Sequence, residues 1–162
     1  MSLEEKIKKI KLLVSDIDGV WTDGTINIHA DGTESVNFSV LDGFGLMSLN
    51  KKNIEVAIIS GRDNPAVASR AKKLGIEKIY LGKLNKGEII KKIIKEAALN
   101  KDQVASIGDD LPDLEMFAES GLCFAPQTAM PEVLEAADYT CKLPAGKGAL
   151  REICDLLIKS KA

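Results

Sequence analysis

The chain has 162 residues, of which 45% are hydrophobic, and this suits one domain built around a single core. It carries 22 basic and 24 acidic residues, a net charge of −2 that gives no reason to expect a nucleic-acid or membrane partner. No apolar run approaches the roughly 18–20 residues that span a bilayer, and the charged start lacks the apolar segment of a signal peptide. Because the three scattered cysteines suit a reducing compartment, we expect one cytoplasmic domain over residues 1–162.

Short apolar runs alternate with helical patterns along the chain, which is the signature of a parallel sheet covered by helices. The expected strands are residues 12–15, 56–60, 78–81, 104–107 and 122–125, followed by a brief strand at 139–140. Between the first two strands, residues 25–28 and 35–38 flank the turn signal Ala30-Asp31-Gly32. We therefore expect a β-hairpin insertion over about residues 22–38.

Three helices can be expected from their start signals or apolar faces. Asn64-Pro65 places a capping residue before a proline at the first helical position. Asn85 and Glu88 have the spacing of a capping box and precede a helical apolar pattern. Apolar residues at 150, 153, 154, 157 and 158 lie on one face of a last helix.

Two carboxylates, Asp16 and Asp18, lie at the end of the first expected strand, where Gly19 breaks it. In an open α/β sheet, this carboxyl end of a strand is where ligands bind. Two acids without a neutralising partner would repel each other there. They make sense around a bound cation such as Mg²⁺, or as a nucleophile and proton donor for phosphoryl transfer.

Polar groups follow each of the next three strands as well. They are Ser60-Gly61-Arg62 after the second strand, Lys86 after the third, and Gly108-Asp109-Asp110 with Asp113 after the fourth. Lys86 lies in the first turn of a helix, where the ammonium and the helix dipole both favour an anion. Carboxylates, a hydroxyl and a lysine around one point predict a metal-assisted phosphoryl-transfer site.

These elements resemble the four motifs of the haloacid dehalogenase superfamily of phosphohydrolases, and the similarity extends over residues 12–157. It is greater still to one branch, the small capless sugar-acid phosphatases typified by the 3-deoxy-D-manno-octulosonate 8-phosphate phosphatases. The segments that carry the similarity are residues 16–24, Asp42-Gly43-Phe44-Gly45, residues 59–62, residues 82–86, residues 108–113 and a glycine-rich segment at residues 146–152. The resemblance implies an α/β fold, with a three-layer Rossmann-like parallel sheet, helices on both faces and a small hairpin insertion.

The resemblance also implies a catalytic mechanism. Asp16 would form an aspartyl-phosphate, and Asp18 would act first as acid and then as base. Mg²⁺ would be held by Asp16, by the backbone carbonyl of Asp18 and by Asp109. Ser60, Gly61 and Lys86 would bind the phosphoryl oxygens. Asp110 and Asp113 would orient Lys86 or metal-bound waters, and the sequence does not rank these two.

The implied substrate is a sugar-acid phosphate, most specifically 3-deoxy-D-manno-octulosonate 8-phosphate, which belongs to lipopolysaccharide synthesis. The residues expected on the sugar side are Asp18, Ser39, Asp42, Gly43, Arg62 and Arg70. A guanidinium suits the carboxylate of a sugar acid because it can bind both oxygens. The hairpin is too short to cover the site, and the branch closes its sites by forming tetramers. We therefore expect a homotetramer.

Three other functions could use part of this set of residues. A phosphatase for a nonulosonate 9-phosphate would use the same chemistry on a nine-carbon sugar acid. A catalytically silent partner of a nucleotide-sugar synthetase would not need the full set of chemical residues that is present here. A signalling receiver domain is disfavoured because its phosphorylated aspartate lies on a later strand than its acidic pair, whereas here that strand ends in Ser60-Gly61.

Overall fold

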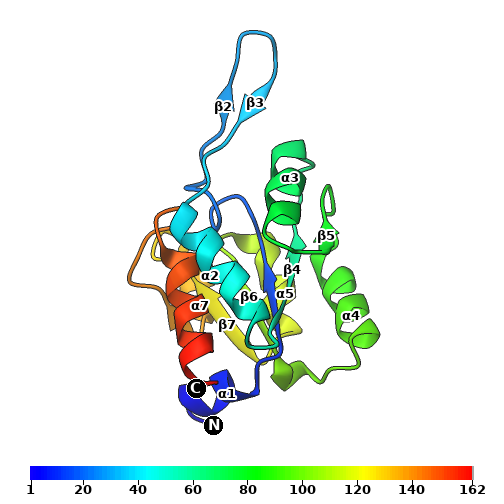
Figure 1. Cartoon of the computed structure of the whole chain (residues 1–162), viewed down its shortest axis with the longest axis vertical. Coiled ribbons are helices and arrows are strands. Elements are labelled where there is room, and N and C mark those ends of the chain that lie inside the picture. Colours follow the sequence, from blue (N-terminus) through cyan, green and yellow to red (C-terminus); the bar gives the residue numbers. More distant parts are fainter. Residues whose placement is uncertain (162) are drawn as a thin grey trace.

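In the computed structural model, which describes residues 1–161, six parallel strands form one sheet with helices on both faces (Figure 1). The strands are β1 (Leu12–Ser15), β4 (Glu55–Ile59), β5 (Lys78–Tyr80), β6 (Val104–Ile107), β7 (Leu122–Ala125) and β8 (Tyr139–Thr140). Their order in the sheet is β5-β4-β1-β6-β7-β8. The predicted three-layer fold is confirmed, and the strand bounds agree with the expectation to within one residue.

The strand order reverses at β1, and this fixes where a ligand site can form. From β1 the chain adds β4 and β5 on one side, then returns to add β6, β7 and β8 on the other. Ser15, the last residue of β1, is paired with Ile58 of β4 and Ile107 of β6, so the three strands end almost level. The loops after these strands therefore meet at the topological switch point of the sheet.

Over residues 1–161, seven α-helices connect or flank the strands. They are α1 (Leu3–Lys9), α2 (Val40–Asn50), α3 (Pro65–Lys73), α4 (Lys86–Glu96), α5 (Leu114–Ala118), α6 (Pro131–Ala136) and α7 (Ala149–Lys159). The predicted cap of α3 is present, because the Asn64 side chain accepts the N–H of Ala66 at 3.0 Å. Within residues 1–161, no helix is long and apolar enough to cross a bilayer.

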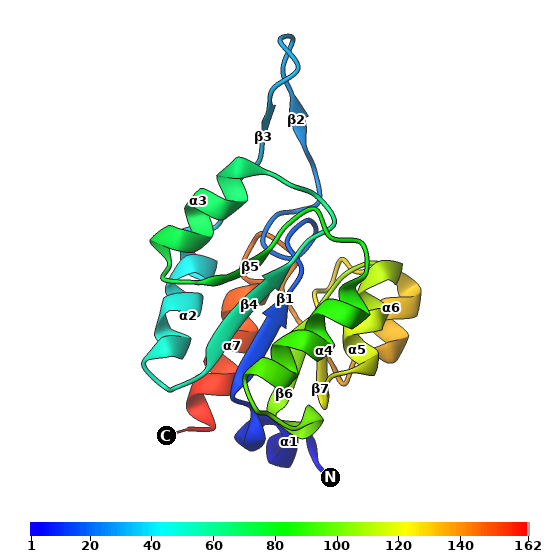
Figure 2. The same ribbon diagram turned by 90° about the vertical axis from the view of Figure 1, so that its right-hand side faces the viewer.

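Alternate residues of β1 serve the two faces of the sheet. Leu13 packs into the core formed with α1, α2, α3 and α7, whereas Leu12 and Val14 pack against α4 and α5. Figure 2 shows α4, α5 and α6 together on one side of the sheet, with α2 and α7 on the other. Because Asp16 continues the alternation of Leu12 and Val14, its side chain leaves β1 on the α4 side, where it meets Lys86.

The helices α1 and α2 are among those that the three predicted helices did not include. α1 begins with a capping box, in which the hydroxyl of Ser2 accepts the N–H of Glu5 and the Glu5 carboxylate accepts the N–H of Ser2. α2 contains Gly43 and Gly45, which lower its intrinsic helix propensity. A Cβ on Gly45 would lie 3.0 Å from the Cβ of Cys154 in α7. Close packing on α7 therefore explains α2 better than its local sequence does.

The predicted capping box at the start of α4 is wrong. The side chain of Asn85 makes no cap hydrogen bond within the described chain, and its backbone (φ −87°, ψ 63°) lies outside the extended region usual for a cap. The Glu115 carboxylate, from α5, instead accepts the N–H of Gly87 at 2.9 Å. A distant acceptor therefore replaces the local one.

The predicted hairpin is confirmed, with two short strands, β2 (Asn27–Ile28) and β3 (Glu34–Ser35). Asp31 stabilises the turn by accepting hydrogen bonds from the N–H and the hydroxyl of Thr33, and Gly32 takes a φ of +85°. Figures 1 and 2 show the hairpin rising beyond the edge of the sheet at which the parallel strands end. The hairpin therefore stands beside the expected site.

Candidate active site

A cleft of about 200 Å³ lies at the carboxyl ends of β1, β4 and β6. Its lining includes nine predicted site residues, namely Asp16, Asp18, Ser60, Gly61, Arg62, Lys86, Asp109, Asp110 and Asp113. Leu84 and Pro112 also line it. The chain thus brings together residues from four loops, as the strand order requires.

A buried lysine joins two of the carboxylates. Lys86 Nζ lies 2.8 Å from Asp16 Oδ1 and 2.6 Å from Asp113 Oδ1, and all three side chains are less than 10% exposed. Burial opposes the charge on the lysine, but the two carboxylates outweigh this effect and raise the pKa of Lys86. The ammonium is therefore fixed in place and charged.

The structure distinguishes Asp113 from Asp110, which the sequence could not. Asp113 Oδ2 accepts the backbone N–H groups of Asp109 at 2.9 Å and Asp110 at 3.2 Å, while its other oxygen holds Lys86. Asp110 is exposed, and its carboxylate accepts the N–H of Leu111 at the start of a short 3-10 helix. Asp113 is thus the group that holds the loop after β6 to the lysine.

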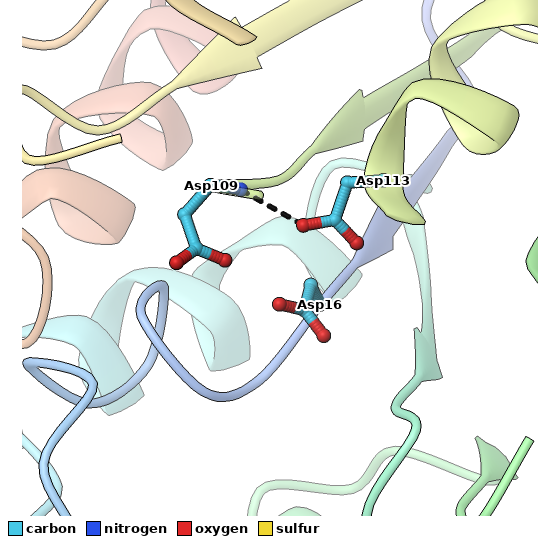
Figure 3. A group of neighbouring side chains, drawn as sticks. All are labelled: Asp16, Asp109 and Asp113. Atoms are coloured by element: carbon cyan, nitrogen blue, oxygen red, sulfur yellow. Dashed lines mark hydrogen bonds between the residues drawn. The ribbon is translucent and has the colours of Figure 1, made fainter. Parts of the chain in front are cut away.

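Three carboxylates converge in the cleft (Figure 3). Asp16, Asp109 and Asp113 each offer an oxygen, and these atoms lie within 4.8 Å of one another. Both oxygens of Asp113 already accept hydrogen bonds, whereas Asp109 Oδ1 is buried without a hydrogen-bond partner in the described chain. Hard oxygen ligands of this kind suit a divalent cation such as Mg²⁺. Asp16 and Asp109 are therefore the side chains best placed to hold one.

The pKa values of these acids reflect a shortage of positive charge. Burial, together with the charges of Asp16, Asp113 and Asp110, raises the pKa of Asp109 to about 9. Burial and Asp113 raise the pKa of Asp16 to about 6, although Lys86 acts in the opposite direction. One ammonium does not neutralise three neighbouring carboxylates. The donor set thus fits a cation that would supply the missing charge.

Gly19 allows the loop after β1 to pass over Asp109. Its φ is +84°, and a Cβ at this position would lie 1.9 Å from Asp109 Oδ2. Any larger residue would both strain the backbone and displace that carboxylate. This close approach explains in physical terms why a glycine follows Asp18.

Arg62 and Asp18 form the outer part of the cleft. Arg62 Nε lies 3.3 Å from Asp18 Oδ2, and the guanidinium also contacts Glu34 of the hairpin. Burial raises the pKa of Asp18, although the charges of Arg62 and Lys86 act against this. Glu34 is a residue that the sequence reasoning missed. A glutamate in a hairpin strand gives no local signal that it faces a loop 28 positions away.

Four residues expected on the sugar side do not line the cleft in the described chain, and their contact with a sugar stays a prediction. They are Ser39, Asp42, Gly43 and Arg70. Ser39 caps α2, and Arg70 packs over Gly43, where a Cβ would lie 2.4 Å from Arg70 Nη2. Asp42 is 3% exposed, and its Oδ1 accepts the N–H of Arg151 in the first turn of α7 at 2.9 Å. Asp42 thus ties α2 to the start of α7.

Replacing Asp42 by alanine is expected to lower the free energy of unfolding by about 1–3 kcal/mol, because the N–H of Arg151 would lose its buried acceptor. Urea unfolding would measure the change. Asp155→Ala is the matched control, because Asp155 pairs with the side chain of the same arginine from a partly exposed position, and its loss should cost at most about 0.5 kcal/mol. Equal losses in the two variants would contradict the capping role.

Without a cation, stability is expected to fall as pH rises from about 4 to 9. The unfolded chain ionises aspartate near pH 4, whereas Asp16 and Asp109 hold their protons to about pH 6 and 9 when folded. The folded state thus binds more protons in this window. Mg²⁺ needs the ionised forms, so it should raise Tm more at pH 8 than at pH 5.5, as thermal unfolding with Mg²⁺ or chelator would show. Asp109→Asn should remove most of this difference, and a Tm increment independent of pH would contradict the assignment.

Comparisons with known proteins agree with the resemblance found in the sequence. A model of the haloacid dehalogenase-like hydrolase family matches residues 76–153. The chain is 38% identical over 159 residues to the 3-deoxy-D-manno-octulosonate 8-phosphate phosphatase of Haemophilus influenzae, covering 98% of this chain and 88% of that protein.

Solved structures give the same result. The phosphatase of that name from Yersinia pestis has a TM-score of 0.96 at 37% identity, covering 98% of this chain and 86% of that one. The Moraxella catarrhalis phosphatase, solved with a magnesium ion, a phosphate ion and KDO, has a TM-score of 0.94 at 38% identity, covering 97% and 90%. The chain therefore belongs to the haloacid dehalogenase-like hydrolases, in the family of the 3-deoxy-D-manno-octulosonate 8-phosphate phosphatases.

Proposed function

We propose that this phosphatase is Mg²⁺-dependent and hydrolyses 3-deoxy-D-manno-octulosonate 8-phosphate through an aspartyl-phosphate on Asp16. The observation that carries the proposal is the buried carboxylate of Asp16, held by Lys86 beside the unpartnered oxygen of Asp109. A nucleophile, a fixed cation and an unsatisfied acid meet at the one edge of the sheet where ligands bind. The substrate named for the relatives is a sugar acid, and its carboxylate would pair with the other cation of the cleft, Arg62.

Asp16 is suited to attack phosphorus. Its pKa of about 6 leaves it ionised at neutral pH, and Lys86 orients it through Oδ1. Attack forms a bond from a carboxylate oxygen to phosphorus and breaks the bond to the sugar oxygen. Lys86, the hydroxyl of Ser60 and the N–H of Gly61 would then hold the phosphoryl oxygens as charge shifts onto them.

Asp18 is suited to move the proton. Its raised pKa favours the protonated form that the departing sugar oxygen needs, and it lines the cleft from the same loop as Asp16. Having given up its proton, Asp18 would take one from the water that hydrolyses the aspartyl-phosphate. One carboxyl group thus serves as acid in the first step and as base in the second.

The cation would be held by the side chains of Asp16 and Asp109 and by the backbone carbonyl of Asp18. When bound, it would offset the repulsion between an anionic nucleophile and a phosphate dianion. Asp113 would position Lys86 and would not bind the cation, because both carboxylate oxygens of Asp113 already accept hydrogen bonds. A homologous phosphatase solved with magnesium supports the choice of ion.

We also propose a homotetramer, acting in the cytoplasm in lipopolysaccharide sugar synthesis. Four large apolar residues of α2, Val40, Leu41, Phe44 and Met47, are between 43% and 80% exposed. A contiguous apolar helix face of this kind suits contact with another subunit. The cleft is also open, so neighbouring subunits would help to exclude water from it. Light scattering would test the assembly, and Phe44→Glu should favour smaller species.

The function is tested by phosphate release from three substrates, each assayed with Mg²⁺ and with chelator. They are 3-deoxy-D-manno-octulosonate 8-phosphate, a nonulosonate 9-phosphate and p-nitrophenyl phosphate. Preference for the first, lost with chelator, is the expected result. Preference for the nine-carbon compound would keep the mechanism and replace the substrate. No release from any of them would favour a silent partner of a nucleotide-sugar synthetase.

A further inference from the structure

Arg62 differs from Lys86 in how firmly it is held. These two residues are the cations among the described residues that line the cleft. The side chain of Lys86 is 5% exposed and lies between two buried carboxylates. The side chain of Arg62 is 38% exposed, and its Nη2 contacts the Glu34 carboxylate of β3, which is 37% exposed. Arg62 is thus the more exposed cation of the cleft, and the one whose carboxylate partner a ligand could displace.

The pair of Arg62 and Glu34 is suited to exchange. Its two partners are solvated, and no second hydrogen bond holds the Glu34 carboxylate among residues 1–161. Exposed pairs of this kind are worth about a two- to fivefold change in a binding constant at most. Arg62 Nε is turned toward Asp18, so Nη2 is the corner of the guanidinium that faces the hairpin. A second carboxylate can take that corner at little cost.

We propose that Glu34 competes with the carboxylate of the sugar acid for Arg62 and so sets the affinity for substrate and product. This inference rests on the proposed function. Substrate binding would exchange one carboxylate for another on the guanidinium, so that Arg62 stays paired throughout. After hydrolysis the product keeps its carboxylate but has lost its phosphate. Glu34 would then reclaim Arg62 and promote product release. Glu34 is a positioning residue, because it acts through Arg62.

The test compares wild type with Glu34→Gln, which keeps the shape of the side chain and removes its charge. Hydrolysis of p-nitrophenyl phosphate, which has no carboxylate, is inhibited with 3-deoxy-D-manno-octulosonate. We expect Glu34→Gln to lower the inhibition constant of the sugar acid about two- to fivefold, and KM for its 8-phosphate by a similar factor. KM for p-nitrophenyl phosphate should change by less than about twofold. If Glu34 had only a structural role, the substitution would change the sugar-acid constants and KM for p-nitrophenyl phosphate by similar factors.

Two controls sharpen the comparison. Glu55→Gln removes the same charge from an exposed pair between Glu55 of β4 and Lys78 of β5, away from the cleft. It should leave the inhibition constant unchanged. In an Arg62→Ala background, Glu34→Gln should have no further effect on sugar-acid inhibition. If Glu34→Gln leaves sugar-acid binding unchanged or weakens it while wild type hydrolyses the 8-phosphate, this inference fails alone. If wild type neither binds the sugar acid nor hydrolyses its phosphate, the proposed substrate fails, and this inference with it.

Discussion

Replacing Asp16 by asparagine is expected to lower kcat/KM by at least about 10³-fold. The amide keeps the shape of the side chain, but its neutral oxygen is too weak a nucleophile to form an acyl phosphate. It also removes one of the two carboxylates best placed to hold a cation. Phosphate release measured at saturating Mg²⁺ would test this result, because saturation separates loss of the nucleophile from weaker metal binding.

Asp110→Asn is the matched control for Asp16→Asn. Asp110 also lines the cleft, but it is exposed and its carboxylate only caps the loop that follows β6. We expect this change to lower kcat/KM by less than about tenfold. Both variants should keep the far-ultraviolet circular dichroism of the wild type. Activity in Asp16→Asn within tenfold of wild type would exclude Asp16 as the nucleophile.

The sequence was sufficient to predict the residues that meet in the cleft because each lies shortly after the carboxyl end of a strand. Parallel strands in one sheet present their carboxyl ends at one edge, so Asp16, Ser60 and Asp109 had to come close once the strands were correct. The side of the sheet was also predictable in principle, because alternation from Leu12 and Val14 directs Asp16 toward α4. Local pattern and topology together were enough for this part of the site.

Contacts between distant segments could not be predicted in this way. Asp42 caps α7 across 109 positions, and this role depends on how α2 packs on α7. The two glycines of α2 lower its helix propensity, so the local sequence predicts neither the helix nor its packing. The cap of α4 shows the same limit, because a local acceptor was predicted and Glu115 of α5 takes its place. Glu34 meets Arg62 only because the hairpin stands beside the cleft.

Replacing Lys86 by methionine is expected to lower kcat/KM by about 10²–10³-fold and the free energy of unfolding by about 3–5 kcal/mol at neutral pH. The change leaves the buried carboxylates of Asp16 and Asp113 facing each other without their cation. Activity and urea unfolding would be measured in parallel. Lys91→Met is the control on the same helix, because Lys91 is exposed and its loss should affect neither quantity appreciably.

A second change separates the structural role of Lys86 from its catalytic role. Adding Asp113→Asn to Lys86→Met removes one of the two unpaired charges, so part of the lost stability should return. Activity should not return, because no cation would face the phosphoryl oxygens from α4. Recovery of both properties would mean that Lys86 only holds the acids apart. Recovery of stability alone would mean that the chain keeps a buried ammonium at this place, despite the cost of burying it, for the chemistry it performs.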